Sequence, residues 1–153
     1  MSNFTQPAYH PKEKVVRAAN FLDDYFGPHA DSPDATPERR DNAVMLLDLV
    51  NPLLQSAEHN GIDLDMNPKT QSLVSGTQYG GFRPQNCPEG APHSSHKEGM
   101  AVDVYDPHGD LDRWLSDLIL ERASLYREHP ADTDGWTHLT TRAPASGKRT
   151  FHP

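Results

Sequence analysis

Hydrophobic side chains recur at the 3.6-residue period of an amphipathic helix in three segments of the chain. These segments are residues 12–26, 36–61 and 110–127. The second has the clearest beginning, because Thr36 can cap a helix and Pro37 suits its first turn. We therefore predict three helices, and we expect the second to be the main helix of the core.

Alternation of side chains between two faces indicates strands elsewhere in the chain. The clearest strand covers residues 99–105, with two valines on one face and Gly, Ala and Asp103 on the other. Residues 136–141 predict a second strand, and residues 72–75 a short one. The order of these elements predicts an α+β fold, in which a small antiparallel sheet is flanked by about three helices.

The chain has 153 residues, of which 35% are hydrophobic, 10 are glycine and 14 are proline. This length suits one domain with a single core, and the many glycines and prolines predict long loops. We expect residues 1–35 to form an N-terminal helix and loop that pack on the same domain. Residues 36–153 would then form its main part.

The net charge of −8 and the isoelectric point near 5.5 disfavour binding to nucleic acid, which requires a basic surface. A single cysteine, Cys87, excludes an intramolecular disulfide framework. No apolar run approaches the roughly 20 residues of a membrane helix, so we expect no membrane insertion. The N-terminus has no pattern of a signal peptide, so we expect the protein to be cytoplasmic on synthesis. We also expect a monomer.

The candidate chemistry lies around a long polar loop, residues 76–95, of a kind that is more often functional than idle. His96 follows this loop, Asp103 lies on the small-residue face of the next strand, and His138 lies within the last strand. Two histidines and one carboxylate, with a fourth position left for water, are typical of a catalytic zinc site. The alternative is that the three are ordinary polar residues with structural partners.

Residues 94–103 read Ser-Ser-His-Lys-Glu-Gly-Met-Ala-Val-Asp and match the pattern Ser-x-His-x-x-Gly-x-Ala-x-Asp. This string closely resembles the zinc D-alanyl-D-alanine carboxypeptidase family, which is related to vancomycin-resistance dipeptidases and hedgehog domains. Shorter segments resemble the same family, with the tail closest to phage-encoded members, at residues 81–86, 90–93, 135–139 and 141–151. The resemblance covers about residues 36–153.

The resemblance implies that His96, Asp103 and His138 are the zinc ligands. It also implies that Ser94 hydrogen-bonds the substrate and that Arg83 holds a substrate carboxylate, which the planar guanidinium suits. A surface salt bridge is an equally good interpretation of Arg83.

Many members of the family carry a catalytic glutamate three residues before the last histidine, where this chain has Gly135. Asp134 is one step further away, with Asp132 also near, and we predict that Asp134 is the general base. His93 precedes the motif, and it could bind substrate or lie on the surface of the loop.

The function implied is zinc-dependent hydrolysis of peptidoglycan stem peptides by an endopeptidase or a D,D-carboxypeptidase. A phage-type lytic enzyme (an endolysin) that degrades the bacterial cell wall fits a single-domain chain with one cysteine and no expected secretion signal. The alternatives are a catalytically impaired metal-binding or virion structural domain, favoured by Gly135, and a cytosolic D,D-dipeptidase.

Overall fold

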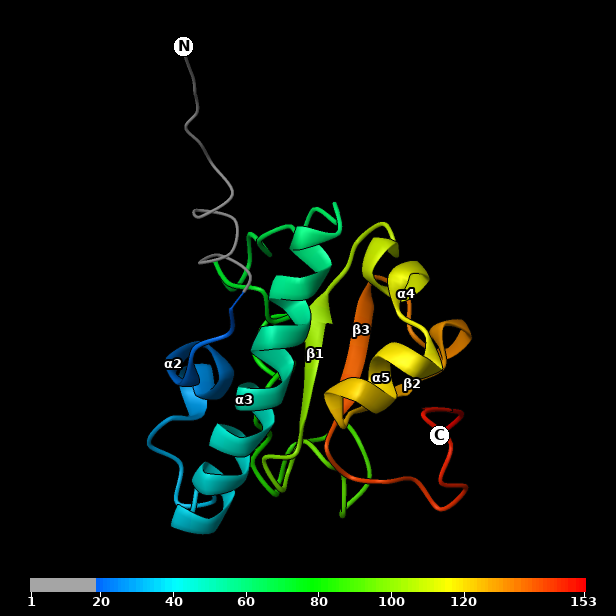
Figure 1. The fold of residues 1–153 in the computed structure, drawn as a ribbon. Coiled ribbons are helices and arrows are strands. Elements are labelled where there is room, and N and C mark those ends of the chain that lie inside the picture. The colour runs from blue at the N-terminus through cyan, green and yellow to red at the C-terminus, as the bar shows by residue number, and fades with distance from the viewer. Residues whose placement is uncertain (1–18) are drawn as a thin grey trace.

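The computed structural model of the protein describes residues 19–153 (Figure 1). The helices are α2 (Leu22–Phe26), α3 (Pro37–His59), α4 (Asp110–Trp114) and α5 (Asp117–Ala123), with 3₁₀ turns η2 (Gly27–His29) and η3 (Pro130–Asp132). The strands are β1 (Ala101–Tyr105), β2 (Tyr126–Glu128), β3 (Trp136–Thr140) and β4 (Thr150–Phe151). None of the helices in this part of the chain is long and apolar enough to cross a membrane.

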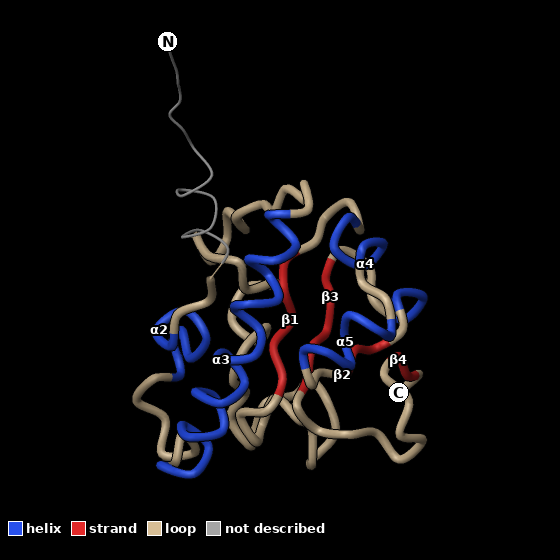
Figure 2. The backbone as a smooth tube through the Cα atoms, in the orientation of Figure 1, coloured by secondary structure: helices blue, strands red, loops and turns tan. Residues whose placement is uncertain are grey.

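The four strands form one small sheet in the order β1-β3-β2-β4, which is drawn in red in Figure 2. β3 pairs antiparallel with both β1 and β2, whereas β4 pairs parallel with β2. The predicted α+β class and the small sheet with a few helices are confirmed. The sheet is mixed rather than purely antiparallel, because β4 is reached through the long turn that follows β3 and runs beside β2 in the same direction.

Helix α3 runs alongside β1 in Figure 1 and is the main helix of the core, as predicted. The side chain of Thr36 caps it by accepting a hydrogen bond from the backbone N–H of Arg39 at 3.3 Å. The helix carries a continuous buried stripe: Ala43, Leu46, Leu47, Val50, Leu53, Leu54 and Ala57. This stripe joins Val102, Val104 and Leu139 of the sheet in one hydrophobic cluster, so one face of the sheet is closed.

The prediction of one helix over residues 110–127 is wrong. The chain leaves helical geometry at Leu115, and Ser116 starts a new helix by accepting a hydrogen bond from the backbone N–H of Ile119 at 3.2 Å. The end of the predicted helix is instead strand β2. The apolar spacing of this segment fits two short helices as well as one long one, so the periodicity did not reveal the break.

The predicted strand at residues 72–75 is reduced to isolated bridges, one of which joins Val74 to Val104 at the edge of β1 opposite to β3. The part of the predicted first helix at residues 12–18 lies outside the described residues, and the described helix begins only at Leu22. Tyr25 in α2 is buried in the main cluster, so this helix packs on the same core as α3.

Candidate metal centre

The sheet places Asp103 and His138 side by side. They are directly paired in the antiparallel register of β1 and β3. Paired side chains point to the same face, with Cβ atoms about 5 Å apart. That face is opposite to Val102 and Leu139, which are buried in the core. Two polar residues far apart in sequence therefore meet on the open face of the sheet.

His96 comes from the tight turn that leads into β1. Backbone hydrogen bonds from Gly99 and Met100 close this turn, and Gly99 adopts a φ of 75°. A side chain at Gly99 would collide with the carbonyl oxygen of Arg39 in α3, so only glycine lets the turn pack against that helix. The packing fixes where His96 enters the site.

The three side chains point one nitrogen or oxygen each at a common position. Nε2 of His96 lies 3.3 Å from Oδ1 of Asp103 and 3.3 Å from Nδ1 of His138, and the last two atoms are 2.9 Å apart. Tetrahedral ligands of a zinc ion are roughly 3.4 Å from one another, given metal–ligand bonds of about 2.1 Å. The observed separations are slightly shorter, so the group could bind a metal ion after a small expansion.

Two neighbours orient the ligands. Nδ1–H of His96 donates a hydrogen bond to the carbonyl oxygen of Gly81 at 2.8 Å, which leaves Nε2 with its lone pair toward the site. Nη2 of Arg83 lies 3.3 Å from Oδ2 of Asp103, which leaves Oδ1 facing the histidines. Outer partners of this kind are usual around metal ligands.

Burial and charge keep the ligands in the protonation states that metals require. Burial lowers the pKa of His96, which favours the neutral ring. Burial also pushes the pKa of Asp103 upward, but the neighbouring His96 and His138 more than offset this effect, and the net pKa is lowered. A neutral imidazole and an ionised carboxylate are the forms that coordinate a metal.

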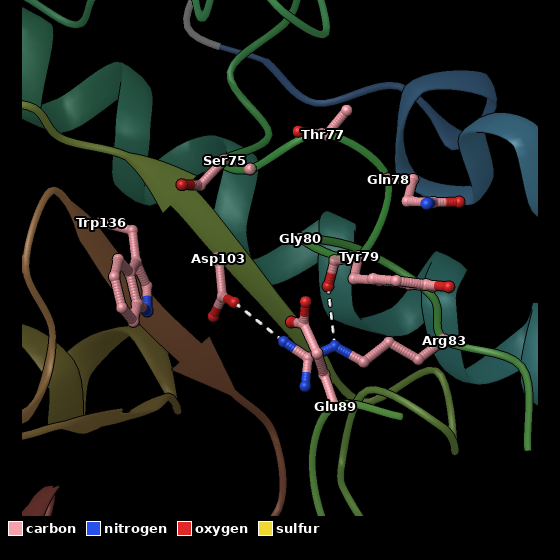
Figure 3. Close-up of a pocket in the computed structure, with 10 residues that line it drawn as sticks. Ser75, Thr77, Gln78, Tyr79, Gly80, Arg83, Glu89, Asp103 and Trp136 are labelled. Atoms are coloured by element: carbon pink, nitrogen blue, oxygen red, sulfur yellow. Dashed lines mark hydrogen bonds and ion pairs between the residues drawn. The ribbon is translucent and has the colours of Figure 1, made fainter. Parts of the chain in front are cut away.

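A cleft of about 480 Å³ opens beside Asp103 (Figure 3). Its walls include Arg83, Glu89 and Trp136, and the remaining wall is the segment 75–80 of the long loop. Figure 3 shows the guanidinium of Arg83 directed toward Asp103 and held on its other side by the carbonyl oxygen of Tyr79. The cleft is therefore a mixed acidic, basic and aromatic space, and one candidate metal ligand, Asp103, lines it.

Arg83 does form a salt bridge, but with the candidate ligand Asp103 and largely buried, since its side chain is only 12% exposed. Its contact with a substrate carboxylate stays a prediction. The hydroxyl of Ser94 accepts a hydrogen bond from the backbone N–H of His96 at 3.2 Å and so helps to form the turn. His93 is exposed, and its carbonyl oxygen accepts from Arg142. The substrate contacts of Ser94 and His93 stay predictions.

Asp134, the predicted general base, is exposed in the segment between η3 and β3. Its role as the base stays a prediction. It also stays a prediction that Gly135 occupies the position where the resembled family carries its catalytic glutamate. Gly135 adopts a φ of 92°, a conformation that glutamate rarely takes. The turn before β3 is thus built for glycine in this chain.

Sequence reasoning missed Glu128 in β2. The pKa of Glu128 is raised, mainly by burial and further by Asp103 and Asp132, while His138 and Arg83 act in the opposite direction. These interactions show that Glu128 lies within electrostatic range of the site. In the structure the burial alternates along this segment, with Leu125 and Arg127 buried and Tyr126 and Glu128 half-buried. The sequence does not show this alternation, because the buried position 127 is an arginine.

A second group of possible ligands lies near the C-terminus, at His129, Asp132 and His152. Nδ1 of His152 lies 2.6 Å from Oδ2 of Asp132, and the ring of His152 stacks on His129 at 4.4 Å. Nδ1 of His129 accepts the backbone N–H of Ala131 at 3.0 Å. Nδ1 of each histidine already has a protein partner, and two of the three side chains are exposed, so this group fits a clasp for the chain end better than a metal site.

In comparisons with known proteins, no family model, no curated protein and no solved structure matches this chain.

Proposed function

We propose that the protein is a zinc-dependent peptidase that hydrolyses peptidoglycan stem peptides. The observation that carries this proposal is the convergence of His96, Asp103 and His138 beside a cleft that Asp103 and Arg83 line. Three protein ligands with space beside them are typical of catalytic zinc, whereas structural zinc sites are closed by four.

The donor set favours zinc over harder cations. Two imidazole nitrogens and one carboxylate oxygen suit zinc, whereas calcium and magnesium prefer oxygen ligands. Bound there, zinc would lower the pKa of a water ligand toward about 7 and polarise a carbonyl group in the cleft. The protein's own contribution is to hold His96 and Asp103 in fixed orientations through Gly81 and Arg83.

Arg83 is the proposed anchor for a substrate carboxylate. Its Nε donates to the carbonyl oxygen of Tyr79 at 2.7 Å, and its Nη2 contacts Asp103, so the guanidinium is held in place. Within residues 19–153, Nη1 of Arg83 has no hydrogen-bond partner, and it can bind one oxygen of a carboxylate. Trp136 provides an apolar wall of the same cleft. Stem peptides carry several carboxylates, which fits this arrangement.

The assignment to the cell wall, and to a phage-type lytic enzyme, rests on the resemblance of residues 94–103 to the zinc carboxypeptidase family. Cleavage of an internal bond and removal of a terminal D-alanine are both compatible with one arginine beside the metal. A second candidate function, a metal-binding domain without catalysis, is favoured by one observation. Gly135 stands where many members of that family carry the catalytic glutamate.

The test is incubation of the zinc-loaded protein with purified sacculi, followed by mass spectrometry of the released muropeptides. We expect cleaved stem peptides, no cleavage after chelation, and recovery when zinc is restored. Asp103→Ala is the matched variant, because it removes the carboxylate ligand; it should lose both zinc and activity. A folded wild-type protein that holds zinc and releases no peptide from sacculi or from free stem peptides would leave the non-catalytic domain as the better interpretation.

A further inference from the structure

A row of side chains crosses the open face of the sheet at the level of the candidate ligands. Asp103 pairs with His138 across β1 and β3. The register of β2 on β3 pairs Arg127 with Leu139, and one further step places Glu128 beside His138. In β4, Phe151 pairs with Glu128. Paired residues share a face, so Glu128 points to the same side as Asp103 and His138.

The ring of Phe151 supplies independent evidence for this placement. Its centroid lies 6.3 Å from that of His138, and the two planes are nearly perpendicular at 86°. β2 lies between β3 and β4, so this ring contact spans the strand that carries Glu128. Glu128 is accordingly half-buried, between an aromatic ring and a candidate metal ligand. A carboxylate in such a position is held beside the site and partly shielded from bulk water.

The other acidic groups near the site are placed differently. Asp103 is itself a candidate ligand, and Asp132 is paired with His152. Glu89 lines the cleft from the long loop and is exposed, and Asp134 is exposed in the turn before β3. Glu128 is therefore the carboxylate whose strand, face and register all bring it to the metal ligands without making it one of the three.

We infer that Glu128 is the general base and general acid of the proposed peptidase. This inference rests on the proposed function, and it replaces Asp134 in that role. The oxygen of the attacking water forms a bond to the scissile carbonyl carbon, and one water proton moves to a carboxylate oxygen of Glu128. The carbon–nitrogen bond then breaks, and the same proton moves from Glu128 to the leaving nitrogen. The second water proton passes from the new carboxyl group to the released amine, so the products are a carboxylate and an ammonium group, and Glu128 is ionised again.

The first test compares three variants of the zinc-loaded protein on purified sacculi. Glu128→Gln keeps the size of the side chain and should lower kcat by roughly 10²- to 10⁴-fold, with KM and zinc content near wild type. Asp134→Asn should remain active. Glu121→Gln, on the exposed side of α5, is the matched control and should behave as wild type. Full activity of Glu128→Gln would overturn the inference. Loss of activity in Asp134→Asn would overturn it as well.

The second test does not depend on hydrolysis. Acetohydroxamate binds zinc through two oxygens and presents a proton that a neighbouring carboxylate can accept. Calorimetry should show that Glu128→Gln weakens its binding by roughly tenfold or more, because a hydrogen bond to a charged group is lost. Equal binding by wild type and variant would overturn the inference, and so would loss of zinc from the variant.

The two tests separate the two proposals. If the wild type cleaves nothing but its hydroxamate affinity depends on Glu128, the proposed function fails, while the placement of Glu128 at the metal stands. If Glu128→Gln does not fold, Glu128→Asp takes its place, because it retains a carboxylate that is one methylene shorter. This variant should keep partial activity and hydroxamate binding. Wild-type kcat in Glu128→Asp together with an unfolded glutamine variant would instead assign Glu128 a structural role.

Discussion

The guanidinium of Arg83 contacts the outer oxygen of Asp103, with Nη2 of Arg83 lying 3.3 Å from Oδ2. The inner oxygen of the same carboxylate faces His96 and His138. One aspartate therefore links the proposed substrate anchor to the candidate metal site. Arg83 can both orient a ligand and bind substrate, and these two roles have different experimental consequences.

Replacing Arg83 with glutamine should mainly impair substrate binding. We expect KM for stem peptides to rise by roughly tenfold or more, because a charge-assisted contact is lost. Zinc content should fall little, since His96, Asp103 and His138 remain. Steady-state kinetics and metal analysis of the purified variant measure the two effects. Arg122→Gln on α5 is the control, because Arg122 is exposed and should alter neither quantity. Loss of zinc with unchanged KM would assign Arg83 to ligand orientation alone.

Removing the metal should lower the melting temperature, and adding zinc should restore it. A ligand that binds only the folded state stabilises it by about 4 kcal/mol at a thousandfold excess over its Kd. His138→Ala should abolish this response, because it removes a ligand supplied by β3. His152→Ala should keep it, because His152 belongs to the clasp at the chain end. Thermal denaturation with and without zinc measures the difference, and a response lost in His152→Ala alone would move the metal to that second group.

Replacing Gly81 with alanine should disturb the metal site indirectly, by displacing the backbone carbonyl that orients His96. A Cβ there would collide with the carbonyl oxygen of Tyr25, and Gly81 supplies the carbonyl that orients His96. We expect Gly81→Ala to be less stable and to bind zinc about 10- to 100-fold more weakly, as is usual when an outer partner of a ligand is displaced. Competition with a chromophoric chelator measures the affinity. Ala91→Ser, at an exposed position of the loop, is the control.

The metal-free protein should lose stability as the pH falls. The pKa of His96 in the folded protein lies below its ordinary 6.5, so below that pH the unfolded chain binds the proton more readily. The pKa of Asp103 is also lowered from its ordinary 3.8, so further stability is lost as the pH falls below about 4. By linkage, both groups make unfolding easier in acid.

Urea denaturation of the chelated protein between pH 7.5 and about 2.5 measures this effect. The midpoint should decline below about pH 6.5. In His96→Gln the part of the decline that begins near pH 6.5 should disappear, while the part due to Asp103 should be reduced because a histidine partner is missing. A midpoint in the wild type that stays constant or rises toward pH 5 would contradict the buried, neutral state assigned to His96.

Several features of the fold follow from local sequence alone. The cap at Thr36 and the stripe along α3 depend on neighbours within a few residues, and they were predicted correctly. The strands β1 and β3 were predicted from alternation within their own residues. Residues 94–103 likewise place His96 and Asp103 at a fixed spacing, because one turn and half a strand separate them. Local periodicity is sufficient wherever the determining contacts are local.

Local sequence could not distinguish one helix from two over residues 110–127, nor recognise β2 at the end of that segment. The strand exists because β3 and β4 pair with its two edges, and those partners are distant in sequence. The position of Glu128 beside His138 is a consequence of that pairing. No spacing along the chain encodes it.

The sequence by itself therefore determined which residue types are available for metal chemistry, on which strands they lie and which way they face. The tertiary structure decided which of them meet. The β1–β3 register joins Asp103 to His138, and the return of the chain at Gly81 fixes the ring of His96. The physical reason is that strand register and chain crossings are set by packing of the whole core, where each contact depends on residues tens of positions away.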